Sequence, residues 1–489
     1  MTNLDYSTAT QLAAALRAKQ VSAVELVNRS IARIETLDTR INAVIARDFD
    51  KARADAVLAD KALAAGDRRP LLGLPMTVKE AFNVAGLPTT WGLTPFKDFR
   101  PPEDALIVTR AKAAGAIVLG KTNVPLLLAD YQSYNDIYGT TNNPWDLKRT
   151  PGGSSGGSAA ALAAGYVPLE LGSDIGGSLR VPAAFCGVYA HKPSQGLVPS
   201  RGHTPPGVPP GPDDVDLAVV GPMARSAADL SLLFDVIAGP DEPLATGYQL
   251  ALRPPRHTRL ADFRVLVLDT HPLLPTALAI TSAMARLTER LAKSGCSISH
   301  STPLLPDLSL AGRIYIQQLM AFMVGPDMPA EAYRGMQSMA AALPPQDTSL
   351  MSARVQGIVL SHRDWVQAER IRSGIRMRWA ALFREWDVVV CPALSTLALA
   401  HDHSDRQQRT VDINGQSCGY DDTLVWPGVA TLTGLPSTAI PLEISAAGLP
   451  VGVQVIGPFL EDRTTLKFAE LVEQAFGGFV APAAFAAAA

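Results

Sequence analysis

The sequence has few cysteines, almost no net charge and no apolar run long enough to cross a membrane. Its four cysteines lie far apart, without a CxxC pair or metal-ligand spacing: Cys186, Cys296, Cys391 and Cys418. This pattern favours reduced core cysteines in a cytoplasmic protein over a disulfide framework. The pair His401 and His403 has no further placed ligand nearby in sequence, so we expect a solvated loop and no metal site.

The charge balance argues against nucleic acid as a partner. Lys and Arg number 43 against 46 Asp and Glu, a net charge of −3, and no basic stripe alternates with aromatic residues. The first residues lack the basic and apolar segments of a signal peptide, and no membrane span is expected. No organic cofactor is expected either, because GGSSGGS lacks the Lys-Ser/Thr ending of a phosphate loop and GSDIGGS lacks dinucleotide glycine spacing.

Two glycine- and serine-rich clusters, Gly152–Ser158 and Gly176–Ser178, stand out, and each runs into a short apolar segment. Glycine lets the backbone approach a ligand closely, and a helix that begins after such a turn points free N–H groups at an anion. A buried strand is expected at Tyr166–Leu171, so a flexible linker is disfavoured. The clusters predict a site that attacks a carbonyl group and holds the resulting oxyanion.

Helical periodicity and short apolar runs alternate along the chain, which predicts an α/β fold. The expected helices span 7–19, 22–37, 44–65, 104–114, 276–293 and 463–475. The expected strands span 72–79, 116–121, 166–171, 264–269, 387–391, 437–441 and 451–456. Residues 193–212 predict a proline-rich loop, 221–239 a turn and a helix, and 295–385 an irregular helical region.

No repeat and no composition shift marks a domain boundary, so we expect a single domain over residues 1–489. Its catalytic core is expected at about 72–240 and 386–475. A variable region at about 300–435 is expected to shape the substrate pocket, and the alanine-rich tail 483–489 is expected to fray.

Several blocks of this sequence resemble the amidase signature family, in the order that the family uses. They are MTVKEAFNVAG, GKTNVP, TNNPWDLKRTPGGSSGGSAAALAAG and LGSDIGGSLRVPAAFCGV, followed by GPMARSAADL and GLPSTAIPL…GLPVGVQVIGP. This set of sequence motifs is highly specific for the family. The resemblance implies an α/β/α domain with a central twisted mixed β-sheet flanked by helices, and a Ser–cis-Ser–Lys triad.

The resemblance also assigns roles to individual residues. It places the triad lysine at Lys79, the bridging serine, which follows a cis peptide bond, at Ser154, and the nucleophile at Ser178. It implies an oxyanion hole made by the backbone N–H groups of Ile175, Gly176, Gly177 and Ser178.

Three further residues are expected to support the site. The resemblance suggests that Asp174 and Arg180 pair to brace the turn, with an ordinary surface ion pair as the alternative. Ser155 is expected to cap the helix that follows it and to orient the site.

Elementary chemistry agrees with this placement. A serine hydroxyl is a weak nucleophile unless a nearby base removes its proton. No GxSxG elbow with a histidine is present, and the nearest histidine, His191, is expected to be structural. Lys79 can act as the base only if burial lowers its pKa from about 10.4 to near neutrality. The apolar stretch Leu72–Val78 before it favours such burial.

We therefore expect an amidase that hydrolyses the C–N bond of a small-molecule carboxamide through an acyl-enzyme on Ser178, without a metal or cofactor. Aryl or apolar amides are expected, with carbamates and esters left open, because the apolar residues Leu126, Tyr131 and Trp426 are expected in the pocket. Two alternatives stay open: the glutaminase-type A subunit of a tRNA-dependent amidotransferase, and a catalytically silent binding protein. A homodimer, and a gating role for the loop 202–212, also stay open.

Overall fold

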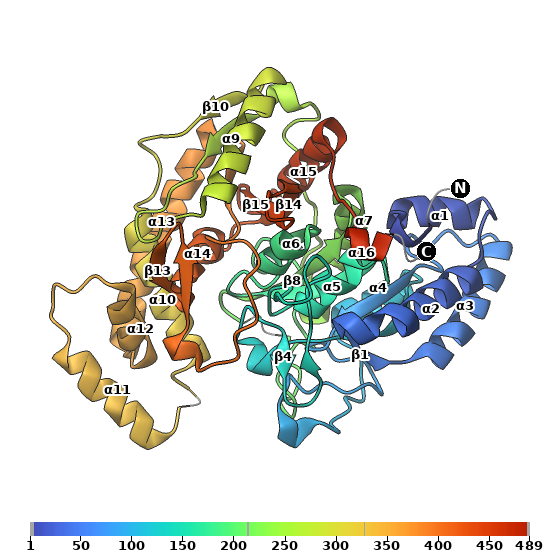
Figure 1. Ribbon diagram of the computed structural model, residues 1–489, viewed down its shortest axis with the longest axis horizontal. Coiled ribbons are helices and arrows are strands. Elements are labelled where there is room, and N and C mark those ends of the chain that lie inside the picture. Colours follow the sequence, from blue (N-terminus) through green and yellow to red (C-terminus); the bar gives the residue numbers. More distant parts are fainter. Residues whose placement is uncertain (1–3, 213–214, 327, 487–489) are drawn as a thin grey trace.

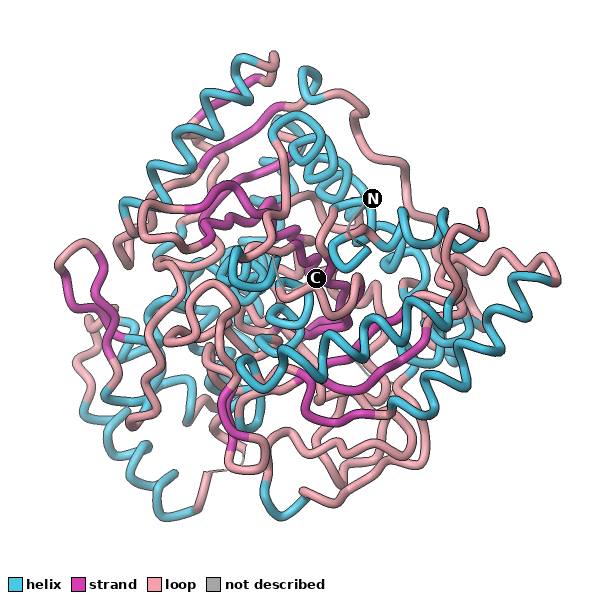
Figure 2. Tube along the Cα trace, turned by 45° about the vertical axis from the view of Figure 1, so that its right-hand side comes forward, coloured by secondary structure: helices cyan, strands magenta, loops and turns pink. Residues whose placement is uncertain are grey.

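The computed structural model describes residues 4–212, 215–326 and 328–486, and an 11-stranded sheet runs through its centre. The strands, in their order across the sheet, are β1 (Val44–Arg47), β3 (Ile117–Thr122), β2 (Pro75–Lys79), β6 (Leu169–Asp174), β8 (Val219–Ala224), β7 (Tyr189–Lys192), β14 (Ser437–Ile444), β15 (Pro450–Ile456), β11 (Val388–Pro392), β9 (Arg264–Val267) and β10 (Ser297–Ser299). Figure 2 shows these strands in the interior with helices around them.

The sheet is mixed, as predicted. Neighbours run parallel along β3–β2–β6 and along β11–β9–β10, and antiparallel in every other pair. Two small hairpins lie outside it: β4 (Tyr134–Asn135) with β5 (Gly139–Thr140), and β12 (Thr410–Ile413) with β13 (Gln416–Gly419). Because β2 and β6 are parallel neighbours, their carboxyl ends emerge side by side at one edge.

Helices surround the sheet. They are α1 (Ala9–Arg17), α2 (Ala23–Ile41), α3 (Phe49–Ala64), α4 (Leu106–Ala113), α5 (Gly156–Ala163), α6 (Arg180–Cys186), α7 (Ala227–Ile237), α8 (Glu242–Ala245), α9 (Leu278–Lys293), α10 (Leu308–Met323), α11 (Ala330–Ala342), α12 (Leu350–Ile358), α13 (His362–Glu385), α14 (Val425–Thr431), α15 (Asp462–Phe476) and α16 (Ala483–Ala486). Figure 1 places α1–α3 at one end and α10–α13 at the other. Within the described residues, no helix is both long and apolar enough to traverse a lipid bilayer.

Local sequence explains where these helices begin and end. The α2 helix starts where the Ser22 side chain accepts a hydrogen bond from the Glu25 N–H, and it ends at Asn42 in a left-handed conformation. The α1 helix begins with a capping box, in which the Thr8 side chain accepts the Gln11 N–H and the Gln11 side chain accepts the Thr8 N–H. The caps at Thr8 and Ser22 each satisfy an N–H group that the first helical turn leaves without a partner.

Three expectations about secondary structure were wrong. Residues 44–47 form β1, not the start of a helix, because they pair with β3 in the sheet. Residues 219–224 form β8 rather than a turn, because they pair with β6 and β7. The tail forms α16, where the Phe485 side chain is fully buried and its carbonyl accepts from Arg33 at 2.6 Å. Tail residues 487–489 lie outside the described part of the chain.

The apolar core has two parts. One surrounds the sheet and its N-terminal helices, and the other joins α10, α13 and α14 to the segment around Val181. All four cysteines are buried free thiols, as the sequence predicted.

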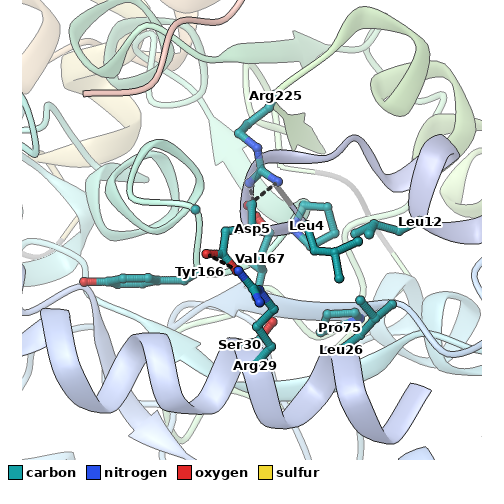
Figure 3. Close-up of a pocket in the computed structure, with 12 residues that line it drawn as sticks. Leu4, Asp5, Leu12, Leu26, Arg29, Ser30, Pro75, Tyr166, Val167 and Arg225 are labelled. Atoms are coloured by element: carbon teal, nitrogen blue, oxygen red, sulfur yellow. Dashed lines mark hydrogen bonds and ion pairs between the residues drawn. The ribbon is translucent and has the colours of Figure 1, made fainter. Parts of the chain in front are cut away.

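Arg225 ties the N-terminal segment to the sheet. It follows β8, is almost fully buried, and donates hydrogen bonds to the carbonyl oxygens of Asp5, Ser7, Leu162 and Val167. Figure 3 shows it beside a small cavity of about 20 Å³, room for about one water molecule. A substrate does not fit such a space. We therefore do not assign this cavity as a substrate-binding site.

Arg225→Met should lower the free energy of unfolding by about 3 kcal/mol, because it removes the hydrogen bonds that the buried guanidinium group donates to four backbone carbonyl oxygens. Urea unfolding measures this change. Arg286→Met is the control, since Arg286 is half exposed and its ion pair with Glu443 lies at the surface; its effect should stay below about 1 kcal/mol. Equal effects of the two variants would contradict the role of Arg225.

Candidate active site

Lys79 is the last residue of β2 and is completely buried. Its Nζ atom lies 2.7 Å from Ser154 Oγ, 2.9 Å from Ser173 Oγ and 3.0 Å from Ser155 Oγ. Three hydroxyl groups thus surround the amine, and no carboxylate forms an ion pair with it among the described residues. The structure therefore brings Lys79 and Ser154 together and adds two further serines.

Burial changes the chemistry of this lysine. Removal from water lowers the pKa of Lys79 to about 7, although the carboxyl groups of Asp174 and Glu170 act in the opposite direction. Near neutral pH the side chain is therefore a free amine in a substantial fraction of molecules. A free amine can accept a proton, which an ammonium group cannot do.

The two glycine- and serine-rich turns lie against each other. The peptide bond between Gly153 and Ser154 is cis, and the Ser155 N–H donates to the Ser178 carbonyl oxygen at 3.2 Å. Gly157, in the first turn of α5, packs closely against the segment after β3, since a Cβ atom on it would lie 2.4 Å from the Asn123 backbone nitrogen. Ser178 is 6% exposed, and its hydroxyl group has no hydrogen-bond partner among the described residues.

A buried ion pair braces the second turn. Asp174 and Arg180 are fully buried and lie 2.8 Å apart, so this is not a surface ion pair. Burial alone would raise the pKa of Asp174, but Arg180 and the backbone amides hold it at about 2. The Asp174 carboxylate also accepts the N–H groups of Gly177, at 2.8 Å, and Leu179, at 3.1 Å.

This bracing corrects the predicted oxyanion hole. The Gly177 N–H points at Asp174 and is therefore already engaged, so it is not free to bind an oxyanion. The N–H groups of Ile175, Gly176 and Ser178 have no acceptor within the described structure. They leave three candidate donors at the turn.

The role predicted for Ser155 as a helix cap was wrong. It stands at the N-cap position of α5, but its side chain makes no capping hydrogen bond and turns toward Lys79 instead. Sequence reasoning missed Ser173, the other added partner of Lys79. Its signal was weak, since it is one small polar residue near the end of the apolar strand β6.

Two tyrosines donate hydrogen bonds to the carbonyl groups of the turn at residues 175–178. Tyr131 donates to the Gly176 carbonyl oxygen at 2.7 Å, and Tyr315, from α10, donates to the Ile175 carbonyl oxygen at 2.9 Å. Tyr315 lies 140 residues from Ile175 along the chain, so no local pattern indicates this contact. Both hydroxyl groups fix the orientation of the peptide planes at the turn.

The three residues expected in the substrate pocket differ in how far they are exposed to solvent. Leu126 is 50% exposed and begins a short 3₁₀ turn, whereas Tyr131 is buried and its hydroxyl group donates to the Gly176 carbonyl oxygen. The Trp426 side chain is fully buried, and its indole N–H donates to Thr276 Oγ1 at 3.1 Å. Trp426 therefore presents no surface to a substrate, and this expectation is corrected.

The histidines considered in the sequence have other partners. His191 is structural, as predicted, because its ring nitrogens contact Thr438 Oγ1 and Asp462 Oδ1. His401 contacts the Asn142 side chain, and His403 stacks on Tyr134. In the described ranges no three His, Cys, Asp or Glu side chains come together as a metal site.

The family relationship follows from sequence comparison. The sequence model described as Amidase matches residues 25–466. Fatty-acid amide hydrolase 2-A of Danio rerio is 32% identical over 97% of this chain and 89% of its own length. The A subunit of the glutamyl-tRNA(Gln) amidotransferase of Anaeromyxobacter dehalogenans is 32% identical over 96% of both chains.

Solved structures agree in fold. A vestigial protein complex described as revealing the origins of an s-triazine catabolic enzyme matches with a TM-score of 0.79 and 28% identity, over 96% of this chain and 98% of that one. A bacterial aryl acylamidase of the amidase signature family matches with a TM-score of 0.78 and 23% identity, over 96% of both chains. The chain belongs to the amidase signature family. It is an amidohydrolase with that family's α/β fold.

Asp174→Asn should reduce kcat/KM by at least about 100-fold and the free energy of unfolding by about 3 kcal/mol, because Arg180 loses the carboxylate that neutralises it. Steady-state kinetics and urea unfolding measure the two effects. Asp235→Asn, at a half-exposed pair with Arg463, is the control and should change neither. Normal kinetics for Asp174→Asn would show that the brace does not matter for activity.

Proposed function

We propose that this protein hydrolyses the C–N bond of linear carboxamides through an acyl-enzyme on Ser178, with Ser154 and Lys79 as the proton relay. The observation that carries the proposal is the 2.7 Å contact between the buried Lys79 amine and Ser154 Oγ. A neutral amine beside a hydroxyl group is the base that a serine nucleophile needs.

The first half of the reaction forms the acyl-enzyme. Ser178 attacks the amide carbonyl while its proton passes to Ser154, whose own proton passes to Lys79. The free N–H groups of Ile175, Gly176 and Ser178 receive the oxyanion, and each such donor is worth roughly 3 kcal/mol of barrier. Ser178 and Ser154 share no side-chain hydrogen bond in the described structure, and such contacts commonly tighten only once substrate is bound.

The second half releases both products. Lys79 returns its proton through Ser154 to the leaving nitrogen, the C–N bond breaks and the amine departs. Water then attacks the ester on Ser178 and loses its proton along the same relay. The carboxylic acid leaves, and Ser178 recovers its hydroxyl group.

An aryl or apolar amide is the substrate class that we favour. The exposed apolar side chain of Leu126 and the 32% identity to a fatty-acid amide hydrolase support this choice. Carbamates and esters expose a similar carbonyl and are accessible to the same attack. The catalytically silent alternative is disfavoured because all three triad residues are present and the lysine is buried.

A second candidate function is glutamine hydrolysis as the A subunit of a tRNA-dependent amidotransferase. The similarity to such a protein over almost the whole chain favours it. It would require partner subunits and a site for the glutamine α-carboxylate. Turnover of free glutamine, or co-purification with such subunits, distinguishes it from an independent amidase.

A panel of anilides, fatty amides, carbamates, aryl esters and glutamine tests both functions. We expect turnover of at least one anilide or fatty amide and a loss of at least about 10⁴-fold in Ser178→Ala, which removes the nucleophile. Trapping of an acyl group on Ser178 by mass spectrometry identifies the intermediate. Wild-type activity in Ser178→Ala would rule the mechanism out.

The pH profile tests the base. Because the pKa of Lys79 is lowered to about 7 and the active form is the neutral amine, kcat/KM should rise with pH through about 7 and then level off. Lys79→Met should abolish this dependence together with most of the activity. Activity that is greatest in acid would instead indicate a carboxylate base.

A further inference from the structure

Glu170 is a carboxyl group in the middle of the sheet. It lies in β6, between β2 and β8, with Leu169 and Leu171 on either side, and its exposed fraction is 0%. A buried carboxyl group without a cation is costly for a fold. Packing alone therefore does not explain a carboxyl group at this position.

The strand register places this carboxyl group close to Lys79. In the parallel pair of β2 and β6, Thr77 is the partner of Glu170 and Val78 is the partner of Leu171. Side chains alternate between faces, so Glu170, Thr77 and Lys79 emerge on the same face of the sheet. The strand spacing and the two-residue offset separate the Cα atoms of Glu170 and Lys79 by about 8 Å, within reach of two long side chains.

Glu170 has polar neighbours but no cation of its own. Its Oε2 atom accepts the Leu171 N–H at 3.0 Å, and Oε1 has no hydrogen-bond partner among the described residues. No arginine or lysine of the described chain forms an ion pair with it. Burial raises the pKa of Glu170 to about 8, while the nearby hydroxyl groups of Thr77, Ser158 and Thr122 oppose that rise.

The other titratable groups near Lys79 are either paired with an opposite charge or neutral. Asp174 is paired with Arg180. His203, from the loop after β7, is neutral because burial and the nearby Lys79 lower its pKa to about 3. Glu170 is thus the carboxyl group near Lys79 that forms no ion pair with a cationic side chain of the described residues.

We propose that Glu170 is a positioning residue that sets the protonation state of Lys79. A neutral carboxylic acid at position 170 leaves the Lys79 amine free to accept a proton from Ser154. An ionised carboxylate stabilises the ammonium form and withholds that base. The inference rests on the proposed function, because it takes Lys79 to be the base.

The test follows the reactivity of Ser178 itself, so it needs no knowledge of the substrate. The rate at which a fluorophosphonate probe labels Ser178 is measured between pH 5 and 10 for the wild type and Glu170→Gln. In the variant, the pH midpoint of labelling should move lower by up to about one unit, because an amide at position 170 cannot ionise and so no longer raises the pKa of Lys79. The maximal rate should stay within about threefold of the wild type.

Glu80→Gln is the matched control. Glu80 is an equally buried carboxyl group next to Lys79 in the sequence, but it interacts with Lys121 and accepts the N–H groups of Thr90 and Trp91. Its removal should leave the midpoint of labelling unchanged. Glu170→Met, which also removes the charge, repeats the test if Glu170→Gln does not fold.

The outcomes separate the two proposals. Failure of the wild type to label Ser178 at any pH would overturn the proposed function itself. Labelling of the wild type with the same midpoint in Glu170→Gln or Glu170→Met would overturn only the role of Glu170. A shift in the Glu170 variants that is absent in Glu80→Gln supports it.

Discussion

The site depends on the removal of one amine from water. Lys79 is held at the end of a fully buried strand, and this burial outweighs the nearby carboxyl groups and lowers its pKa to about 7. A lysine in water would hold its proton at neutral pH and could not accept another. The large sheet supplies the enclosure, because β2 lies between β3 and β6 and is covered along its whole length.

The buried amine has hydroxyl partners because one turn and one neighbouring strand bring three serines to it. Ser154 and Ser155 come from the turn before α5, and Ser173 comes from β6, next to the turn that carries Ser178. The hydrogen bond from the Ser155 N–H to the Ser178 carbonyl oxygen joins the turns directly. The ion pair of Asp174 and Arg180 stabilises the second turn. The Asp174 carboxylate contributes to this by accepting the Gly177 N–H.

Local pattern and family resemblance predicted the parts of this site that are close in sequence. The apolar run before Lys79 predicted that it ends a strand, whereas the family resemblance implied the central mixed sheet and suggested the pairing of Asp174 with Arg180. The contacts of Tyr315 and Ser173 with the site could not be predicted, because they depend on tertiary packing of distant elements. The strands β1 and β8 were missed for a similar reason, since their pairing partners rather than their own residues decide their structure.

Burial alone does not distinguish Lys79, because Lys121 and Lys192 are also fully buried. Removal from water lowers their pKa values as well, to about 8 for Lys121 and about 7 for Lys192. Lys192, however, donates to the carbonyl oxygens of Pro193 and Leu435, and Lys121 donates to the Pro88 carbonyl oxygen and to Thr89 Oγ1.

The difference between these lysines lies in what their partners can do with a proton. A carbonyl oxygen accepts a hydrogen bond but has no proton to give, so it ends a relay. A hydroxyl group both accepts and donates, so Ser154 can receive a proton from one side and release its own to Lys79 on the other. Lys121 also contacts one hydroxyl group, but that of Thr89 does not lie at either of the turns that carry Ser154 and Ser178. Among the three buried amines, Lys79 alone combines a lowered pKa with hydroxyl partners in the turn before α5 and at the end of β6.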